Sequence, residues 1–319
     1  VTRTNPFSSA TNVPVNSIIR LESNEPIDPI TVSSSSFQVR ENTGFTNLTG
    51  TYSVVGSGRR LEFVPSVPLP VSRSHSVFFS SQGIEDLAGN RLTGSNFSFT
   101  TSATADATPP VLLDFTPRDG WSTVATNARI YLRFDEPLAS LSIDAVTLSG
   151  PSGNVAVKRL LSDANRFLVL VPLRPLAPNA TYTLSVGAVE DLAGNAFAVS
   201  VSASFTTELG ADLVRPSVAS VVPPSNSTGV SRTVPVVFTF NERIATATLT
   251  SASFLVFVNN TGVAAAGTIT FSADGLSATF TPSTPLAAST LYRARATSEV
   301  LDLAGQQLNF FDSLFTTGP

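Results

Sequence analysis

Hydrophobic and polar residues alternate over short stretches of the chain. Between residues 128 and 134, small or apolar side chains alternate with Arg129, Tyr131 and Arg133. A period of two predicts a strand with one buried face. Residues 181–186 alternate in the same way, and the apolar run 167–171 predicts a fully buried strand. No stretch keeps the 3.6-residue period of a helix, so the pattern predicts short strands with almost no helix.

Four short motifs recur in the same order, so the chain contains internal repeats. Asp-Leu-Ala-Gly stands at 86–89, 191–194 and 302–305. Phe-Thr-Thr closes each repeat, at 99–101, 205–207 and 315–317. The other two are a glutamate marker at Glu25, Glu136 and Glu242, and a pair of prolines at 65 and 68, 172 and 175, and 282 and 285.

The repeats predict three domains, at 1–103, 107–208 and 214–319, with linkers near 102–108 and 208–214. The first repeat lacks the proline-marked opening of the others, so we expect its first strand to be truncated. About seven strands in each repeat predict an all-β fold of three tandem immunoglobulin-like β-sandwiches. The chain has no methionine, even at position 1. We therefore expect it to be a segment of a longer protein with more such domains on both sides.

The combined motifs resemble the bacterial Ig-like domain typified by S-layer proteins. Its pattern is matched by Phe-Asp-Glu-Pro at 134–137, Tyr-Thr-Leu at 182–184, Asp-Leu-Ala-Gly-Asn at 191–195 and the closing Phe-Thr-Thr. The first repeat departs from it at His75, and the third departs at Arg243 and Gln306. The resemblance implies a structural or adhesive module of an extracellular protein, with relatives in surface filaments and algal flagellar hairs. It does not imply an enzyme.

Composition excludes several classes of function. The chain of 319 residues is 42% hydrophobic and 13% charged, with a net charge of −4. It has no basic block beyond Arg59-Arg60, which argues against nucleic acid as a partner. No apolar run reaches the length of a membrane-spanning helix. Without cysteine there are no disulfides, thiolate nucleophiles or cysteine metal sites, and a single histidine argues against imidazole-based sites.

Acidic residues are expected to converge where domains meet. In an Ig-like sandwich, the glutamate marker and the Asp-Leu-Ala-Gly turn both lie at the pole that faces the preceding domain, and each linker adds an aspartate. Oxygen ligands clustered at a junction form a candidate calcium site. The candidate ligands are Asp106, Glu136 and Asp191 at the first junction, and Asp212, Glu242 and Asp302 at the second.

The alternative is that each turn aspartate only caps its own turn, with glycine at positive φ. The first domain offers Glu25 and Asp86 without an upstream linker, so it should bind calcium less well. No other cofactor is expected.

Catalysis is not expected. Glu136 and Asp191 could form a pair of catalytic carboxylates, but the same pair occurs in every repeat, which is typical of a structural turn. Lys158 is the only lysine, and nothing pairs it with a serine nucleophile.

Other conspicuous side chains have two interpretations each. His75 is expected at the surface or at a strand edge. Trp121 packs either into its own core or against the third domain. Arg293 and Arg295 form either a solvated face or a contact for an anionic glycan. Five Asn-x-Ser/Thr sequons are candidate glycosylation sites: Asn47, Asn96, Asn179, Asn226 and Asn259.

The sequence favours a non-catalytic, extracellular cell-surface protein. In this interpretation the chain is a rod that self-associates to build a surface layer, stalk or filament. One alternative is an adhesin that binds glycan or protein through its domain poles or sheet faces. Another is an accessory stalk of a secreted hydrolase.

Overall fold

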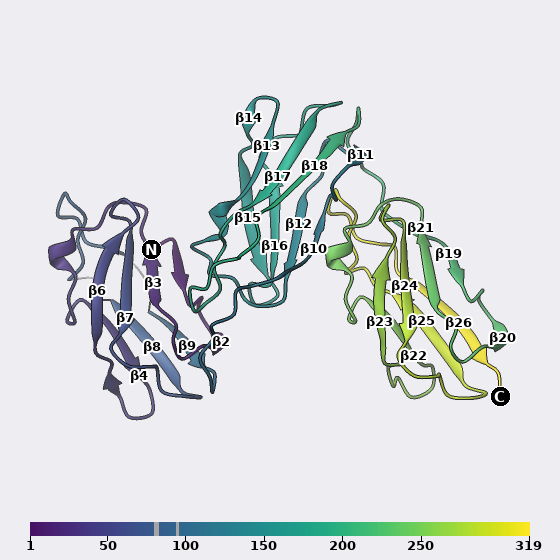
Figure 1. Cartoon of the computed structure of the whole chain (residues 1–319), viewed down its shortest axis with the longest axis horizontal. Helices are drawn as coiled ribbons and strands as arrows, with labels where there is room; N and C mark the ends of the chain where they lie inside the picture. The colour runs from purple at the N-terminus through teal and green to yellow at the C-terminus, as the bar shows by residue number, and fades with distance from the viewer. Residues whose placement is uncertain (80–82, 94–95) are drawn as a thin grey trace.

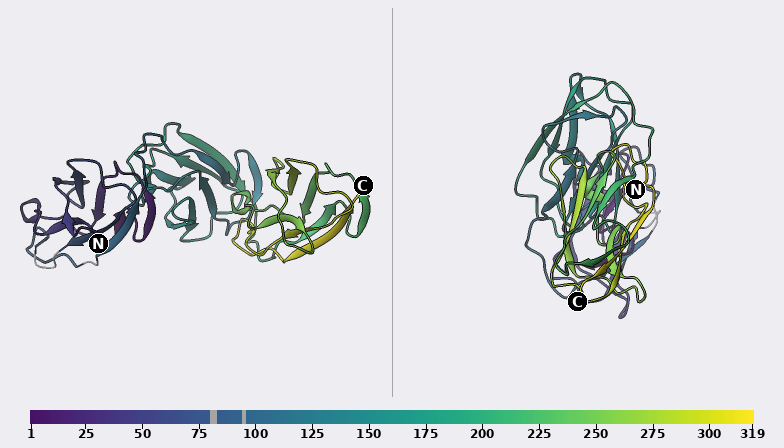
Figure 2. Two further views of the ribbon diagram at one scale, coloured as in Figure 1. Left: turned by 90° about the horizontal axis from the view of Figure 1, so that it is seen from below. Right: turned by 90° about the vertical axis from the view of Figure 1, so that its right-hand side faces the viewer.

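The computed structural model describes residues 1–79, 83–93 and 96–319. Three β-sandwich domains follow one another along the chain in an elongated arrangement (Figure 1). The same succession is visible from below (Figure 2). The predicted all-β fold of tandem Ig-like sandwiches is confirmed.

The middle domain shows the topology most completely. One sheet is antiparallel and consists, in order, of β10 (Leu112–Thr116), β12 (Ile130–Phe134), β16 (Phe167–Pro172) and β15 (Val157–Ser162). The other consists, in order, of β11 (Trp121–Val124), β18 (Val201–Thr207), β17 (Thr181–Val186), β13 (Val146–Gly150) and β14 (Gly153–Asn154). In this second sheet β11 is parallel to β18.

The outer domains repeat this plan. In the first domain the sheets are β1 (Arg3–Asn5), β3 (Ile19–Glu22), β7 (Arg60–Pro65) and β6 (Gly50–Val55), and β2 (Ala10–Val13), β9 (Phe97–Thr101), β8 (Ser74–Phe79), β4 (Phe37–Glu41) and β5 (Thr46–Asn47). In the third they are β19 (Val218–Val222), β21 (Val236–Phe240), β24 (Ser277–Pro282) and β23 (Gly267–Phe271), and β20 (Ser227–Val230), β26 (Phe311–Thr317), β25 (Leu291–Ala296) and β22 (Phe254–Val258).

Helical structure is confined to short turns. The helices found in the described ranges are the 3-10 segments η1 (Pro29–Thr31), η2 (Ile143–Ala145) and η3 (Thr246–Thr248). None of them has the length or apolar character to cross a bilayer.

The first strand of each sandwich changes sheets at a proline. The chain leaves β1, β10 and β19 through Pro6, Pro117 and Pro223, each after a cis peptide bond, and enters β2, β11 and β20 in the opposite sheet. The sequence analysis missed β11 because it has only four residues and two of them are exposed. It also gave no bounds for β13, β14 and β15, of which β14 has only two residues, both exposed.

Aromatic and aliphatic side chains of the strands form the core of each domain. In the middle domain Phe134, Leu170, Leu184 and Phe205 are buried, and Phe240, Phe280 and Phe315 are buried in the third. Phe205 stacks on Tyr182 with ring centroids 5.8 Å apart. The Tyr182 hydroxyl accepts the Ala177 amide at 2.7 Å, which anchors the loop before β17. Tyr292 repeats this arrangement in the third domain with Phe315 and Ala287.

His75 occupies the equivalent position in the first domain, so the surface or strand-edge prediction was wrong. Its side chain faces inward from β8, which lies between β9 and β4, and the residue is 0% exposed. The imidazole stacks on Phe99 with ring centroids 5.2 Å apart. The residue that corresponds to Ala177 is Pro70, which has no amide hydrogen to donate. A phenol at position 75 would therefore lack the partner that it has in the other domains.

Truncating Phe205 to alanine should destabilise the middle domain by about 3–5 kcal/mol, because the cavity left by a buried ring is not refilled. Denaturant melts monitored by Trp121 fluorescence measure this loss. Val199→Ala is the control, because Val199 is exposed, and it should change stability by less than about 0.5 kcal/mol. A loss below about 1 kcal/mol for Phe205→Ala would contradict the assignment of this core.

His75→Phe should remove part of the acid sensitivity of the first domain. Burial lowers the pKa of His75 from its ordinary value of 6.5. The unfolded chain therefore takes up the proton at higher pH than the folded chain. The stability contributed by neutral His75 is complete above about pH 6.5 and is lost as the pH falls from there through the lower folded-state pKa.

Calorimetry of both chains between about pH 8 and about pH 5 measures this effect as the difference between their unfolding midpoints. The two chains must be compared because Glu136 and Glu242 also titrate between these pH values. Their pKa values are raised to about 8, and their effect on stability is the same in both chains. Parallel pH profiles for the two chains would contradict the buried, neutral imidazole.

Candidate functional site: the domain junctions

Each linker is held by an asparagine of the domain before it. The Asn16 side-chain amide donates to the Asp106 carbonyl at 2.7 Å, and its oxygen accepts the Asp106 amide at 2.9 Å. Asn127 binds the backbone of Asp212 with the same two bonds, at 2.7 and 2.9 Å. We call this arrangement the linker clamp. The sequence analysis missed it, although Asn16 and Asn127 occupy the same position in successive repeats.

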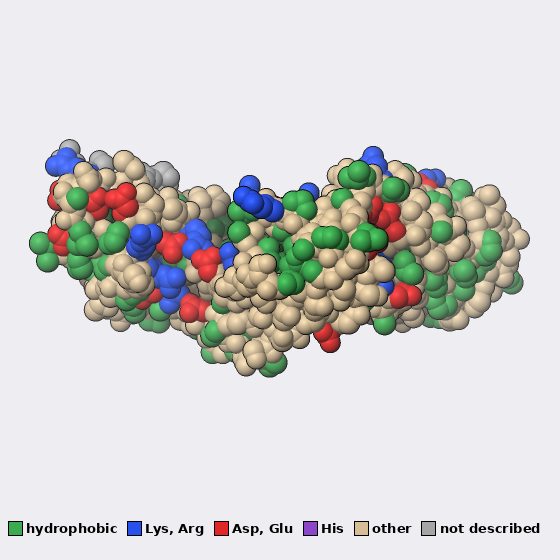
Figure 3. Space-filling model, turned by 90° about the horizontal axis from the view of Figure 1, so that it is seen from above, with side chains coloured by type: hydrophobic (Ala, Val, Ile, Leu, Met, Phe, Trp, Pro, Cys, Tyr) green, Lys and Arg blue, Asp and Glu red, His purple; other side chains and the backbone are tan. Residues whose placement is uncertain are grey.

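Ion pairs connect the first and second domains directly. Arg3 contacts Asp144 at 2.6 Å, and Arg20 contacts Glu190 at 2.5 Å. The Asn5 side chain donates to the Leu192 carbonyl at 3.1 Å. Figure 3 shows the acidic and basic side chains that gather between these two domains. Because Arg20 is largely buried, removing the Glu190 carboxylate should lower the stability of the folded chain.

Trp121 connects the second and third domains, so the junction interpretation of this residue is correct. Its indole N–H donates to the Ala273 carbonyl at 3.0 Å, and the Arg243 guanidinium lies 5.0 Å from its ring centre. The residue is 6% exposed and also touches its own core. A Cβ on Gly275 would lie 2.6 Å from the indole, so only glycine allows this approach.

The glycine of the Asp-Leu-Ala-Gly turn has a second role at the junctions. Gly305 has φ +88°, and a Cβ there would collide with the Arg129 guanidinium from the preceding domain. At the first junction, Arg20 approaches Gly194, which has φ +95°. Both turns need glycine for their backbone conformation, and at the second junction Gly305 also leaves room for Arg129.

Three carboxyl groups meet at each junction, as the sequence predicted. One oxygen from each of Asp106, Glu136 and Asp191 lies within 4.8 Å of the others. Asp212, Glu242 and Asp302 form the same arrangement at the second junction. In both sets the turn aspartate is buried, while the linker aspartate and the glutamate are half-buried. Glu136 follows β12 and Asp191 lies between β17 and β18, so three separate segments build each cluster.

Bringing these carboxyls together disfavours their charged forms. Burial, followed by the charges of Asp191 and Asp106, raises the pKa of Glu136 to about 8. Burial and the neighbouring Asp212 raise the pKa of Glu242 to about 8. Burial also raises the pKa of Asp191 and of Asp302. A proton or a cation at each junction would relieve this cost.

The two turn aspartates differ in how their oxygens are satisfied. Asp191 Oδ1 accepts the amides of Gly194 and Asn195, and its Oδ2 accepts the Asn195 side chain at 2.7 Å. Asp302 Oδ1 accepts the Gln306 amide at 2.8 Å, but its buried Oδ2 has no hydrogen-bond partner among the described residues. The aspartates thus cap their own turns and also converge with the other carboxyls.

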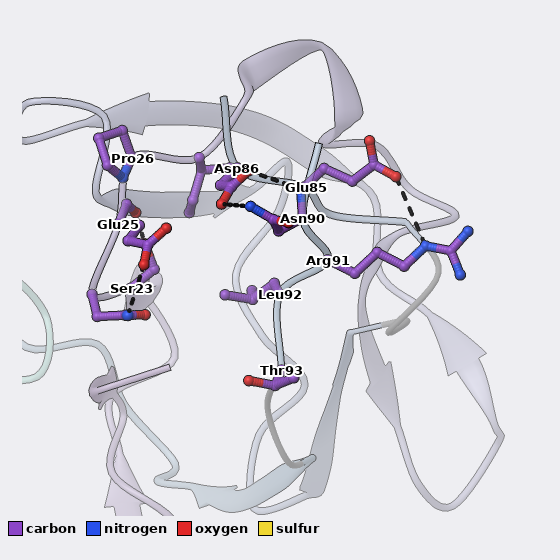
Figure 4. A pocket seen from close by; sticks show the side chains of 11 residues that line it. Ser23, Glu25, Pro26, Glu85, Asp86, Asn90, Arg91, Leu92 and Thr93 are labelled. Atoms are coloured by element: carbon purple, nitrogen blue, oxygen red, sulfur yellow. Dashed lines mark hydrogen bonds and ion pairs between the residues drawn. The ribbon is translucent and has the colours of Figure 1, made fainter. Parts of the chain in front are cut away.

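The corresponding pole of the first domain carries two of the three acidic positions. Glu25 and Asp86 line a polar pocket there, together with Asn90 and Arg91 (Figure 4). Asp86 accepts the Asn90 side chain at 2.9 Å, and this bond with the Asn90 amide lowers its pKa. The direction is opposite to that of Asp191 and Asp302, which neighbouring segments bury.

The remaining candidate residues lie away from the junctions. Arg293 and Arg295 both pair with Asp312, at 2.6 and 2.8 Å, on a half-exposed face, so one carboxylate offsets part of their positive charge. Among the sequons, Asn259 is half-buried and accepts a hydrogen bond from Arg293. The other four asparagines are exposed: Asn47, Asn96, Asn179 and Asn226.

Similar solved structures include bacterial and animal proteins. PcoC, a methionine-rich copper resistance protein from Escherichia coli, is 24% identical over 32% of this chain and 100% of its own, with a TM-score of 0.26. The S-layer protein rSbsC(31-844) is 10% identical over 98% of this chain and 54% of its own, with a TM-score of 0.26. The N-terminal eight Ig domains of Down syndrome cell adhesion molecule are 11% identical over 97% and 39%, with a TM-score of 0.23.

No curated protein matches the chain. The bacterial Ig-like domain family, in contrast, matches residues 1–101, 106–207 and 212–317, which together make up nearly the whole chain. The chain belongs to the bacterial Ig-like domain family, with three members of that family in tandem.

Proposed function

We propose that the chain is a non-catalytic structural segment of an extracellular cell-surface protein, and that it builds a rod within a surface layer, stalk or filament. The observation that carries this proposal is the linker clamp, which recurs with the same bonds at both junctions. A repeated clamp restrains the angle between successive domains in the same way each time. A rod requires restrained angles between its domains, whereas the domains of a flexible tether reorient freely.

The distribution of contacts supports this role. Only residues 102–105 and 208–211 lie between the ranges that match the family, so little free chain separates the domains. Ion pairs and hydrogen bonds then connect domain to domain directly. The domains are therefore in direct contact at both junctions.

The partner in such an assembly would be another copy of the same protein. Each sandwich leaves edge strands, such as β10 and β15 in the middle domain, that can pair with another chain. Leu113 on β10 and Val199, which lines the same surface pocket, are exposed apolar residues. Lateral association along these edges would cover them.

A second candidate function is adhesion, and the polar pocket of the first domain favours it. The pocket combines carboxylates, amides and a guanidinium, which are the groups that hold polar ligands such as glycans (Figure 4). In this role the chain would remain monomeric and capture its ligand in that pocket.

Replacing Asn16 and Asn127 by alanine should loosen both junctions without unfolding the domains, because each loses only the clamp bonds. Small-angle scattering should then show a broader range of overall dimensions than for the unaltered chain. Asn179→Ala is the matched control, because Asn179 is exposed. If the double variant scatters like the unaltered chain, the clamp does not restrain the rod.

Light scattering at increasing protein concentration separates the two candidate functions. The structural role predicts mass growth beyond the monomer, and Leu113→Asp should suppress this growth by charging an exposed apolar edge. A chain that stays monomeric and is retained on an immobilised glycan would instead support adhesion.

A further inference from the structure

We propose that the second junction binds a calcium ion between Asp212, Glu242 and Asp302, and that the first junction binds calcium more weakly. This inference does not depend on the rod or on adhesion. It rests on a difference between two carboxyl clusters that are built from the same three positions.

The ligand set is the first step. The three carboxyl groups each offer an oxygen, and these oxygens lie within 4.8 Å of one another. They come from the linker, from the loop after β21 and from the turn between β25 and β26. Convergence of three carboxyls alone does not make a metal site, because hydrogen bonds can satisfy all of them. The first junction shows how this happens.

At the first junction an asparagine satisfies the turn aspartate. Asn195 donates from its side chain to Asp191 Oδ2 at 2.7 Å and to the Asp106 carbonyl at 3.2 Å. The side-chain amide therefore lies between linker and turn and supplies positive hydrogens to the buried carboxylate. No oxygen of Asp191 is left without a donor.

At the second junction this donor is missing. Gln306 replaces the asparagine, and its longer side chain reaches past the turn to the Val214 carbonyl at 2.8 Å. Asp302 is 0% exposed, and its Oδ2 has no partner in the part of the chain that the structure describes. A buried carboxylate oxygen almost always has a donor or a cation. Each of the other two carboxyls has an oxygen within 4.8 Å of an Asp302 oxygen, and neither makes a hydrogen bond to Oδ2.

The chemistry of the ligands selects the ion. All of them are carboxylate oxygens, which hard divalent cations prefer, and neither histidine nor cysteine is present in the cluster. Calcium accepts irregular sets of six to eight oxygens, whereas magnesium requires near-ideal octahedral geometry. Asp212 and Glu242 are half-buried, so water can complete the coordination shell.

The ion would complete a connection across the junction. Asn127 of the second domain holds the backbone of Asp212 through the linker clamp. Calcium on the Asp212 side chain would tie this same residue to Glu242 and Asp302 of the third domain. One linker residue would then bind the domain before it through its backbone and the domain after it through its carboxylate.

Calcium titrated into the chelator-treated chain tests the proposal. Isothermal titration calorimetry should give a strong site for one ion per chain, with magnesium weaker. Trp121 is the only tryptophan, and it lies against Arg243 beside Glu242. Its fluorescence should therefore report binding at the second junction. The unfolding midpoint should rise with calcium, because a ligand that binds only the folded chain stabilises it.

Exchanging the two turn residues provides the matched variants. Gln306→Asn should give Asp302 Oδ2 a donor and weaken the strong site by about tenfold or more, because ligand charge and rigidity set calcium affinity. Asn195→Gln should free Asp191 Oδ2 and add a second strong site. Asp302→Asn should abolish the second-junction site, with circular dichroism to verify folding. Asp86→Asn is the control and should leave binding unchanged.

The proposal is overturned if millimolar calcium gives neither heat nor a shift in the unfolding midpoint. It is also overturned if Gln306→Asn binds calcium as tightly as the unaltered chain. Neither result would affect the linker clamp or the proposed structural role, which are tested by scattering.

Discussion

The arrangement of the three domains depends on how each linker is bound from both sides. The backbone of Asp106 or Asp212 is held by an asparagine of the preceding domain. From the following domain, the side chain of Asn195 or Gln306 donates to a carbonyl of the same linker. Because each linker is bound by both neighbouring domains, its backbone has much less conformational freedom than an unbound linker of the same length. The direct contacts that Arg20 and Trp121 make between domains further restrict the angle between those domains.

This attachment has an electrostatic cost. Desolvated carboxyls close to one another raise each other's pKa, as at Glu136 and Glu242. The first junction offsets part of this cost with the Asn195 amide, whereas the second leaves a buried oxygen of Asp302 unpaired. The two junctions of this chain thus share the same three carboxyls but differ in how the turn aspartate is hydrogen-bonded.

Much of the fold could be predicted from the sequence because repeats and alternation are local signals. The strands around Phe134 and Tyr182, and the convergence of Asp106, Glu136 and Asp191, followed from the motifs and the resemblance to an Ig-like sandwich. The linker clamp could not be predicted in this way. Asn16 is a single loop asparagine, and its partner lies 90 residues further along the chain.

His75 was misjudged for a related reason. A histidine between two serines suggests an exposed position, whereas its inward-facing place on β8 depends on register within the sheet. Pro70, at the position of Ala177, was the available signal, because it removes the amide that the tyrosine of the other domains binds.

The most direct test of a restrained chain is the distribution of distances between its outer domains. The chain contains no cysteine, so spin labels can be attached at single introduced cysteines, Thr51→Cys on β6 and Thr268→Cys on β23, both at exposed positions. Double electron–electron resonance should then give one narrow distance distribution. A broad distribution, such as independent domains on flexible linkers would produce, would contradict the account.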